Sequence, residues 1–567
     1  MNKIDQLRKL FNKYRIEGYL IPKNDQFFNE FIQQDRDRLK YISNFSGSFG
    51  LALILKKINY LFTDGRYIQQ ATNESSKFYK IIDISEQSVS TLLKKLKIKI
   101  GFDPEFFKYS FINKNKYLIP INKNLIDLVW KRKKNNTLNE AYYLNENFSG
   151  ENYKFKIQKL KNKLKIDKNN FFFISNSENI CWLLNLRGKD SPFTPVLNCN
   201  ALVTNKKLII FCNLKKISKT IKKIYGSYVE FIDEKLICSK ILNNYNKCIK
   251  LDIKTSYKII HFLQKNKIKF KFIADPIFKL KSIKNKIEIQ NTKVAHTLDG
   301  VAVTKFIIWL KTLKKINNMN EISAQLKLEK FRKKNEHYLF PSFPTISGFG
   351  KNASIIHYRA NQLSNLNFKN NNIYLVDSGA QYKQGTTDVT RTISFGKPSR
   401  HHKNIYTRVL KGHISVKEFN LKKNSTGKQI DKAARKYLNN INLDYAHGTG
   451  HGVGFFLNVH ENPPSISKMS DDYFLEGQVV SNEPGFYHPN NFGIRIENLI
   501  YVESKRKKLR FNNLTLVPYD KNLINKKMLN KNEINYINKY HDYIYHLLKN
   551  FMNAKELIIL KKFCSPI

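Results

Sequence analysis

Long apolar runs, cysteine and acidic residues are all scarce in this chain of 567 residues. No stretch of 18 or more apolar residues occurs, so no transmembrane helix is predicted. The first 21 residues carry apolar side chains at helical spacing, but they lack the continuous apolar core of a secretory signal. The six cysteines contain no CxxC pair and are too few for a disulfide framework in so long a chain. We therefore expect a cytoplasmic protein with buried, reduced thiols.

The shortage of acidic residues, 45 against 99 lysines and arginines, gives a formal net charge of +54. Such a charge is compatible with binding to nucleic acid or to an anionic membrane surface. The lysines are scattered along the whole chain, however, and other residues with A/T-rich codons are abundant too. No recognised nucleic-acid-binding motif accompanies the charge. We attribute the excess to base composition and expect neither nucleic acid nor a membrane as a partner.

The length of the chain indicates several domains, and we divide it at residues 1–140, 150–285, 286–505 and 506–567. The first two parts look like distant copies of one α/β unit. Each has an N-[FL]-x-G turn, Asn44–Gly47 and Asn185–Gly188, followed by two apolar runs that a polar turn separates.

The third part begins with a helical pattern over residues 286–313 and changes at residue 371 to short strands with turn punctuation. Residues 371–500 hold 16 Lys or Arg and 11 Asp or Glu, a formal charge of only +5. The segment that carries the candidate chemistry is therefore far less basic than the chain as a whole, which also argues against nucleic acid as a partner. The Lys/Asn-rich residues 506–567 end in a helical pattern and are interpreted as a C-terminal appendage. The adjacent His401 and His402 are expected to point apart in a solvated loop.

Two carboxylates mark this third part. Asp377 ends the apolar run IYLVDSG, and Asp388 lies in TTDVTRTISF. We expect successive strands joined by a glycine-containing turn, which would bring both carboxylates to one face of a hairpin. In GIRIENL, alternation along a strand predicts that Arg495 and Glu497 share the face opposite to the apolar side chains.

Five residues within 121 positions form a ligand set for hard to borderline divalent cations: Asp377, Asp388, His451, Glu483 and Glu497. Four carboxylates carry a charge of about −4 at neutral pH, which two divalent cations would balance. Without metal, so much negative charge in one place would be strongly self-repelling.

Several motifs carry a resemblance to a known family. They include YISNFSGSFG, TDGRYIQQA, ICWLLNLRGKDSPFTPV, DSGAQYKQGTTDVTRT, HGTGHGVG, NEPGFY and FGIRIENL. The chain resembles the three-domain Xaa-Pro aminopeptidases (aminopeptidase P), a group of pita-bread metallopeptidases. The resemblance implies an α/β multidomain fold: two creatinase-like α/β domains, a pita-bread α+β catalytic domain and a short C-terminal appendage.

The resemblance also implies roles for the five residues. Asp377 would bind one divalent metal ion, His451 and Glu483 the other, and Asp388 and Glu497 both. Hydroxide bridging the two ions would attack the Xaa-Pro bond, with Glu483 as proton acceptor and shuttle. We expect Mn²⁺, with Zn²⁺ and Co²⁺ as alternatives.

Three histidines and one arginine match further family positions. His357, His447 and His460 would polarise the carbonyl, stabilise the oxyanion and help to hold the proline. His447 and His451 are separated by glycines, which predicts a loop-and-strand element rather than a helical zinc motif. Arg495 would brace a carboxylate or the site network through a charge-assisted bond. A structural ion pair with a ligand carboxylate and contact with the substrate both stay open for it.

The family further implies a homodimer that acts on short peptides with an N-terminal Xaa-Pro sequence. Two other functions stay open. One is a prolidase that cuts only Xaa-Pro dipeptides, which the extra domains disfavour. The other is a catalytically inactive peptide-binding module, which the complete ligand set disfavours.

Overall fold

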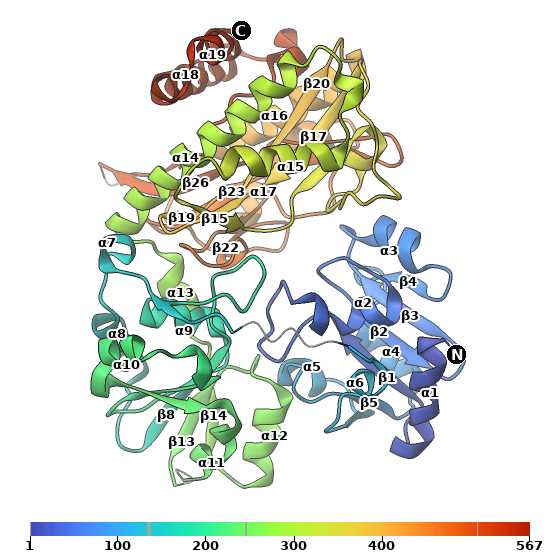
Figure 1. The fold of residues 1–567 in the computed structure, drawn as a ribbon, viewed down its shortest axis with the longest axis vertical. Coiled ribbons are helices and arrows are strands. Elements are labelled where there is room, and N and C mark those ends of the chain that lie inside the picture. Colours follow the sequence, from blue (N-terminus) through green and yellow to red (C-terminus); the bar gives the residue numbers. More distant parts are fainter. Residues whose placement is uncertain (1, 133–137, 244–245, 507) are drawn as a thin grey trace. The chain divides into compact units, whose positions relative to one another are not determined.

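The computed structural model describes residues 2–132, 138–243, 246–506 and 508–567 (Figure 1). The chain folds into two compact units. Unit 1 comprises residues 1–146 and 151–278, and unit 2 comprises residues 147–150 and 279–567. All five carboxylate and imidazole positions predicted to hold metal therefore lie in unit 2.

Unit 1 contains two six-stranded mixed sheets with the same topology. The first has the order β4-β3-β2-β1-β5-β6 and the second β12-β11-β10-β8-β13-β14. In each, the central strand pairs antiparallel with the second strand of the module and parallel with the fifth. The strands of the first sheet are β1 (Gly18–Pro22), β2 (Leu51–Leu55), β3 (Asn59–Thr63), β4 (Lys80–Asp83), β5 (Ile100–Phe102) and β6 (Leu118–Pro120). Those of the second are β8 (Asn170–Ile174), β10 (Cys199–Val203), β11 (Leu208–Cys212), β12 (Val229–Asp233), β13 (Cys248–Leu251) and β14 (Phe270–Phe272).

The repeated turn of the sequence has the same structural role in both modules. Asn44 follows α2 (Arg38–Ser43) and Asn185 follows α9 (Ser177–Leu184), and both adopt the left-handed conformation, with φ of 65° and 52°. Asparagine tolerates that conformation and commonly ends helices. The matching helix ends and sheet orders confirm the prediction of two similar α/β units. Helices that cover these sheets include α1 (Lys3–Tyr14), α3 (Ile68–Ser75), α4 (Val89–Leu96), α8 (Tyr153–Leu164), α10 (Lys219–Tyr225) and α12 (Tyr257–Lys265).

Unit 2 begins with the long helix α14 (Lys286–Thr312), as the sequence pattern predicted. A capping box between Asn285 and Glu288 satisfies the backbone N–H groups at its start. Farther along α14, the buried Asp299 accepts two hydrogen bonds from Arg332 on α15 (Glu321–Arg332). Arg332 also donates to the hydroxyl of Ser378, directly after Asp377, over 3.1 Å. The two helices are thereby tied to the strand that carries the first site carboxylate.

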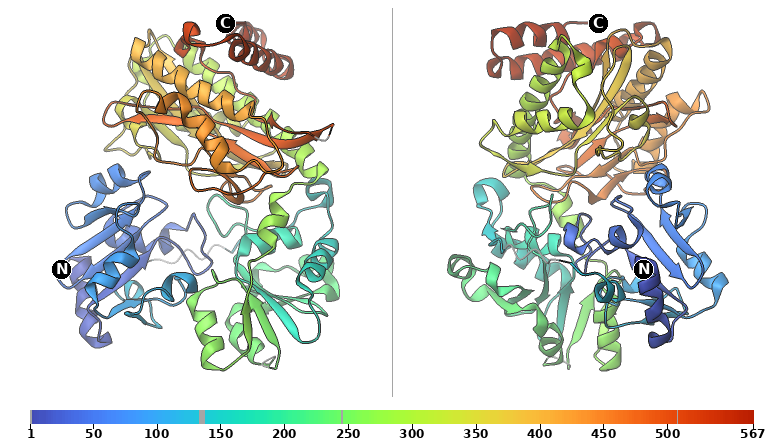
Figure 2. Two further views of the ribbon diagram at one scale, coloured as in Figure 1. Left: turned by 180° about the vertical axis from the view of Figure 1, so that it is seen from behind. Right: turned by 45° about the vertical axis from the view of Figure 1, so that its right-hand side comes forward.

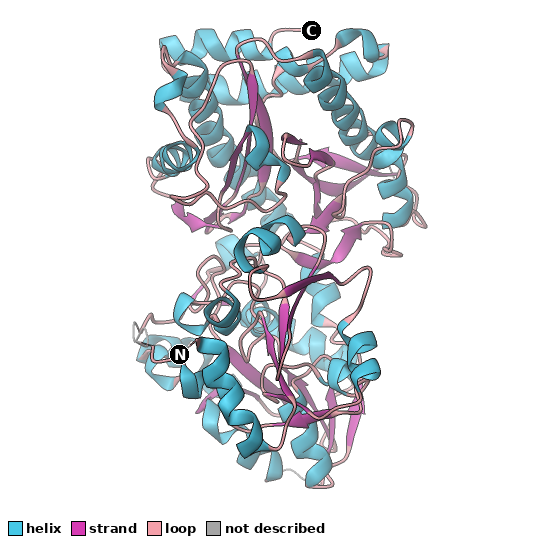
Figure 3. Cartoon of the chain, turned by 90° about the vertical axis from the view of Figure 1, so that its right-hand side faces the viewer, coloured by secondary structure: helices cyan, strands magenta, loops and turns pink. Residues whose placement is uncertain are grey.

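Two sheets form the centre of unit 2, with helices on both sides (Figure 3). Helices α14 and α15 pack on β16-β17-β20. Helices α16 (Arg400–Lys417) and α17 (Gly427–Asn439) pack on β22-β21-β23-β26-β27. The strands are β16 (Ile346–Phe349), β17 (Asn372–Ser378), β20 (Val389–Phe395), β21 (Gly450–Gly452), β22 (Glu461–Ile466), β23 (Val479–Asn482), β26 (Asn498–Lys505) and β27 (Lys508–Asn513). Two smaller sheets join β15 (Tyr338–Pro341), β18 (Ala380–Tyr382) and β19 (Gly385–Thr386), and β24 (Gly485–His488) with β25 (Phe492–Arg495).

The expectation of a solvated loop at His401 and His402 was wrong. Both residues lie in the first turn of α16, which Ser399 caps by accepting from the His402 backbone N–H. Both rings stand edge-on to Phe492, with centroid distances of 5.4 and 4.8 Å. The Pro-Ser dipeptide at 398–399 begins a helix here, and the first helical turn brings the two rings to one apolar neighbour.

The two last helices, α18 (Lys531–Leu548) and α19 (Ala554–Cys564), lie side by side at the end of the chain (Figure 2). They do not form a core of their own. Ile537, Ile544 and Leu560 are buried in one cluster with Tyr406 of α16 and Ile494 of β25. The C-terminal segment therefore shares the hydrophobic core of unit 2.

All six cysteines are free, and four of them are buried, which agrees with the prediction of reduced thiols. Among the described helices, none combines the length and the hydropathy that crossing a bilayer requires.

Candidate metal centre

Asp377 and Asp388 are brought together by the pairing of β17 with β20. The strands are antiparallel, and Asp377 lies opposite Thr390. Asp388 directly precedes β20, which begins at Val389, and Val389 lies opposite Ser378, the neighbour of Asp377. The prediction that both carboxylates lie on strands was wrong for Asp388. The glycine-containing connection between them holds β18 and β19, which join a different sheet.

Glu497 lies just beyond the strand on which the sequence placed it. β25 ends at Arg495, and β26 begins at Asn498. The side chains of Arg495 and Glu497 nevertheless meet at one group, the hydroxyl of Thr390. Arg495 Nε donates to Thr390 Oγ1 over 3.1 Å, and this hydroxyl donates to Glu497 Oε2 over 2.8 Å. The backbone N–H of Glu497 also donates to the carbonyl of Thr390, so Glu497 is held against the strand that follows Asp388.

His451 completes a compact group with the two buried carboxylates. One ligand atom each from Asp388, His451 and Glu497 lies within 4.8 Å of the others. The ring Nδ1 of His451 is 2.9 Å from the carbonyl of Gly452, so Nδ1 is the protonated nitrogen and Nε2 keeps its lone pair. Nε2 lies 3.6 Å from Asp388 Oδ2 and 3.4 Å from Glu483 Oε1. Two atoms that each lie about 2.1 Å from one ion are about 3–3.5 Å apart, so this spacing suits a shared cation.

The loop-and-strand prediction for the histidine pair is confirmed. His447 lies in a loop, and His451 lies on β21. Gly450 lets β21 approach β23 closely, since a Cβ at this position would be 2.0 Å from the carbonyl oxygen of Ser481. Ser481 in turn accepts from the His451 backbone N–H and donates to Glu483 Oε1 over 3.1 Å. The tight glycine contact therefore sets the distance between His451 and Glu483.

A chain of hydrogen bonds joins Asp377 to His447. Arg495 Nη2 donates to Asp377 Oδ2 over 2.6 Å, and Nη1 donates to the hydroxyl of Tyr487 over 2.5 Å. The same hydroxyl is 2.8 Å from His447 Nε2. The other nitrogen of His447 is 2.8 Å from the carbonyl of Gly448 and 3.9 Å from Glu483 Oε2. The sequence motif NEPGFY contained Tyr487, but only the structure gives it a partner.

His460 and His357 lie at the edges of this network. The rings of His460 and His451 meet edge to face, with centroids 4.4 Å apart. His357 is half-buried in the turn after the 3₁₀ helix at residues 350–354. Arg495 Nη1 reaches the carbonyl of the preceding Ile356 at 3.5 Å. The arginine thus contacts the backbone beside one of the histidines.

A second arginine, which the sequence did not single out, braces the loop of His447. Arg435 on α17 donates to the carbonyl of His447 over 2.6 Å and to Asp431 over 2.7 Å. Asp431 accepts from the hydroxyl of Thr449 over 2.6 Å, and the carbonyl of Thr449 accepts from the backbone N–H of Glu483. Helix α17 therefore holds His447 and Thr449, the first part of the segment between the two histidines.

The electrostatics of the metal-free protein favour protonated acids. Burial raises the pKa of Glu483 to about 7, and the neighbouring Asp377 acts in the same direction. Burial, reinforced by the surrounding carboxylates, also raises the pKa values of Asp388 and Glu497. The Oδ1 atoms of Asp377 and Asp388 are buried without a hydrogen-bond partner among the described residues. Unpartnered buried carboxylate oxygens are costly, and cations among them would remove the cost. The donor set therefore fits divalent metal.

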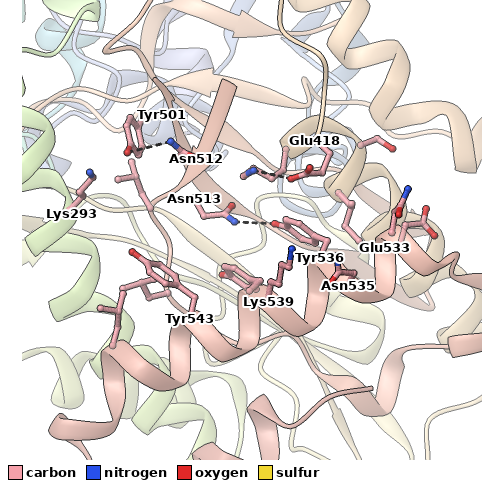
Figure 4. Close-up of a pocket in the computed structure, with 18 of the residues that line it drawn as sticks. Lys293, Glu418, Tyr501, Asn512, Asn513, Glu533, Asn535, Tyr536, Lys539 and Tyr543 are labelled. Atoms are coloured by element: carbon pink, nitrogen blue, oxygen red, sulfur yellow. Dashed lines mark hydrogen bonds and ion pairs between the residues drawn. The ribbon is translucent and has the colours of Figure 1, made fainter. Parts of the chain in front are cut away.

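A larger pocket of about 830 Å³ lies elsewhere, between α18 and the strands β26 and β27 (Figure 4). Asparagine, lysine and tyrosine side chains line much of it, and a hydrogen bond joins Asn513 to Tyr536 across it. None of the proposed metal-site residues lines this pocket.

A group of carboxylates with one imidazole, contributed by both central sheets of unit 2, defines the class of metal-binding proteins. Family models agree with this class along the chain. Residues 290–504 match metallopeptidase family M24, and residues 507–567 match the C-terminal region of that family. Residues 3–128 and 131–288 each match a creatinase/prolidase N-terminal domain.

Individual proteins match over the full length. Xaa-Pro aminopeptidase 1 of Dictyostelium discoideum is 34% identical, with all of this chain and 96% of the relative covered. The structure of an X-prolyl aminopeptidase from Caenorhabditis elegans, described as a cytosolic enzyme with a di-nuclear active site, superposes with a TM-score of 0.93 at 29% identity and covers 100% of this chain and 99% of that one. A prolidase from Pyrococcus furiosus covers 63% of this chain and 98% of its own, with a TM-score of 0.50 and 26% identity.

The chain belongs to metallopeptidase family M24. The resemblance to the three-domain Xaa-Pro aminopeptidases and the predicted fold class, two creatinase-like domains followed by a pita-bread catalytic domain and a C-terminal region, are confirmed.

Proposed function

We propose that this chain is an Xaa-Pro aminopeptidase, which removes the N-terminal residue from peptides whose second residue is proline. One observation carries the proposal: the buried ligand group of Asp388, His451 and Glu497 occurs in a chain that matches Xaa-Pro aminopeptidases from end to end. The divisions at residues 140, 150, 285 and 505 are part of the proposal, with the first two parts limiting access to short peptides.

Two divalent cations would be held by five side chains of unit 2. Asp377 would bind one cation, His451 and Glu483 the other, and Asp388 and Glu497 both. When bound, the cations would lower the pKa of a water molecule between them. We propose Mn²⁺ as the native ion, with Zn²⁺ and Co²⁺ as alternatives that the same donors accept.

The remaining groups act on protons and on the peptide. Glu483 accepts the proton of the attacking water and delivers it to the proline nitrogen. This delivery matters because the nitrogen of a tertiary amide leaves readily only when it is protonated. His447, His460 and His357 would donate to the carbonyl oxygen and its oxyanion or hold the proline ring. Arg495 and Tyr487 would hold the side chains of Asp377 and His447 in position relative to each other.

We also propose a cytoplasmic homodimer without nucleic-acid or membrane partners. A cytosolic structural relative with the same full-length architecture supports the location. The proposal of a homodimer rests on the family resemblance alone, and sedimentation of the purified protein would test it.

Substrate length distinguishes the proposed aminopeptidase activity from the rival prolidase activity. The P. furiosus prolidase matches only 63% of this chain, so more than a third of this chain lies outside that match. We expect cleavage of an Xaa-Pro-Xaa tripeptide to exceed that of the matching Xaa-Pro dipeptide, measured by release of the free amino acid. Preference for the dipeptide would contradict the proposal. Loss of activity with chelator and recovery with Mn²⁺ would exclude an inactive binding module.

A further inference from the structure

The buried guanidinium of Arg391, three residues after Asp388, contacts both backbone segments that carry the proposed bridging carboxylates. Its Nη1 donates to the carbonyl of Thr390 over 2.8 Å and to the carbonyl of Glu497 over 2.6 Å. Arg391 is only 1% exposed. The guanidinium group therefore holds β20 and the segment of Glu497 at a fixed distance from each other.

The other donors of Arg391 reach toward the C-terminal part of the chain. Nη2 donates to Asn498 Oδ1 over 2.8 Å and to the carbonyl of Val517 over 2.6 Å. Nη2 also donates to the hydroxyl of Tyr540 over 3.2 Å, and this hydroxyl lies 2.9 Å from the carbonyl of Thr515. Tyr540 is a buried residue of helix α18. The last helices are thereby joined through one arginine to the metal centre.

The partners of Arg391 are unusual for a buried charge. Every hydrogen-bond acceptor of Arg391 in the described chain is a carbonyl, an amide or a hydroxyl. Burying a charge that has no oppositely charged hydrogen-bond partner is costly. The four site carboxylates lie on neighbouring segments, but none of them accepts a hydrogen bond from Arg391. The several N–H groups of the guanidinium donate to backbone carbonyl oxygens in fixed directions. An ammonium group at this position could not make the same set of hydrogen bonds.

Thr390 transmits this geometry to the carboxylates themselves. Its carbonyl accepts both from Arg391 and from the backbone N–H of Glu497. Its hydroxyl donates to Glu497 Oε2, and Asp388 lies two residues before it in the chain, directly ahead of β20. A shift of Arg391 would therefore move Glu497 relative to Asp388.

We propose that Arg391 and Tyr540 are positioning residues that set the spacing of Asp388 and Glu497, so that helix α18 is part of the scaffold of the metal centre. The inference rests on the proposed function, because it requires these carboxylates to bind metal. Outer partners of ligands commonly change metal affinity 10- to 100-fold when they are lost.

The test is calorimetric titration of Mn²⁺ into the full-length, chelator-treated protein. Tyr540→Phe removes only the hydroxyl, and Arg391→Lys keeps the charge but loses the fork. Both variants should bind Mn²⁺ at least about tenfold more weakly than the unaltered protein. The KM for an Xaa-Pro peptide at saturating Mn²⁺ should stay within about twofold, because neither residue touches the peptide.

Two control variants separate positioning from general destabilisation. Tyr374→Phe removes a buried hydroxyl whose hydrogen bond, over 2.7 Å, is to Ser347 and not to Arg391. Tyr543→Phe alters the same helix on the face that lines the larger pocket (Figure 4). Both should bind Mn²⁺ with unchanged affinity.

Unchanged Mn²⁺ affinity in Tyr540→Phe would overturn the inference, and it would do so even if Arg391→Lys failed to fold. Absence of Mn²⁺, Zn²⁺ and Co²⁺ binding by the unaltered protein would instead overturn the proposed function. The two failures are therefore distinguishable.

Discussion

Arg495 and Asp377 form a buried ion pair with a separation of 2.6 Å, in which the arginine side chain is 2% exposed. The pair leaves Asp377 Oδ1 without a hydrogen-bond partner among the residues that the structure describes. One oxygen of this carboxylate is thus fixed by the arginine, while the other remains to bind a cation.

We expect Arg495→Lys to lower kcat/KM for a proline tripeptide about 10- to 100-fold. Lysine keeps the charge but cannot bond Asp377, Tyr487 and Thr390 together. Steady-state kinetics provide the measurement, with Arg510→Lys as control, because Arg510 pairs with Glu503 at the surface. Equal losses in the two variants would exclude a specific role for Arg495.

Tyr487→Phe should lower kcat about tenfold and leave KM within about twofold. The loss of one hydroxyl frees His447 Nε2 from its 2.8 Å contact and removes an acceptor from Arg495. Tyr501→Phe on β26 serves as the matched control. A change in KM alone would show that Tyr487 acts on peptide binding rather than on the orientation of His447.

Asp388→Asn should reduce kcat/KM about a thousandfold, because a shared ligand contributes several kcal/mol to the reaction. Elemental analysis should find less metal per chain than in the unaltered protein. Asp471→Asn, in an exposed loop of the same unit, is the control. Normal turnover of Asp388→Asn would contradict the assignment of a bridging ligand.

Metal should stabilise the protein more strongly as the pH rises. In the metal-free fold the pKa of Glu483 is raised from 4.5 to about 7, and those of Asp388 and Glu497 are raised as well. The native state therefore holds protons that the unfolded chain releases above about pH 4.5, so these groups destabilise the metal-free protein progressively up to and beyond pH 7. Metal displaces those protons.

The gain in Tm on adding Mn²⁺ to chelator-treated protein should accordingly be larger at pH 7.5 than at pH 5.5. Differential scanning fluorimetry would measure it. Glu483→Gln should reduce the difference between the two pH values, because it removes one of the titrating groups. A gain that is independent of pH would be evidence against proton displacement from these carboxylates.

Local patterns in the sequence predicted much of the fold. The apolar run that ends at Asp377 predicted the strand β17, and the repeated Asn44 and Asn185 turns revealed the two similar modules. Those features depend on residues that are close together in the chain, and such local relationships are visible in the sequence pattern. Glu497 was assigned to a strand that ends two residues earlier, because alternation says nothing about where pairing stops.

Contacts between distant segments were not predictable in the same way. Arg391 and Tyr540 are 149 residues apart in the sequence and meet only through the shared core of the last helices. Arg391 lies in the motif DSGAQYKQGTTDVTRT, which carries the family resemblance, but nothing in the sequence pairs it with Tyr540. Tyr487 was visible in a family motif, but its bond to His447 requires the loop that Arg435 braces.

Metal stoichiometry measured together with peptide cleavage tests the central claim most directly. Chelator-treated protein should be inactive toward an Xaa-Pro-Xaa tripeptide, and activity should rise with added Mn²⁺ until about two ions are bound per chain. Full activity after complete removal of metal, or with a single bound ion, would contradict the dinuclear account.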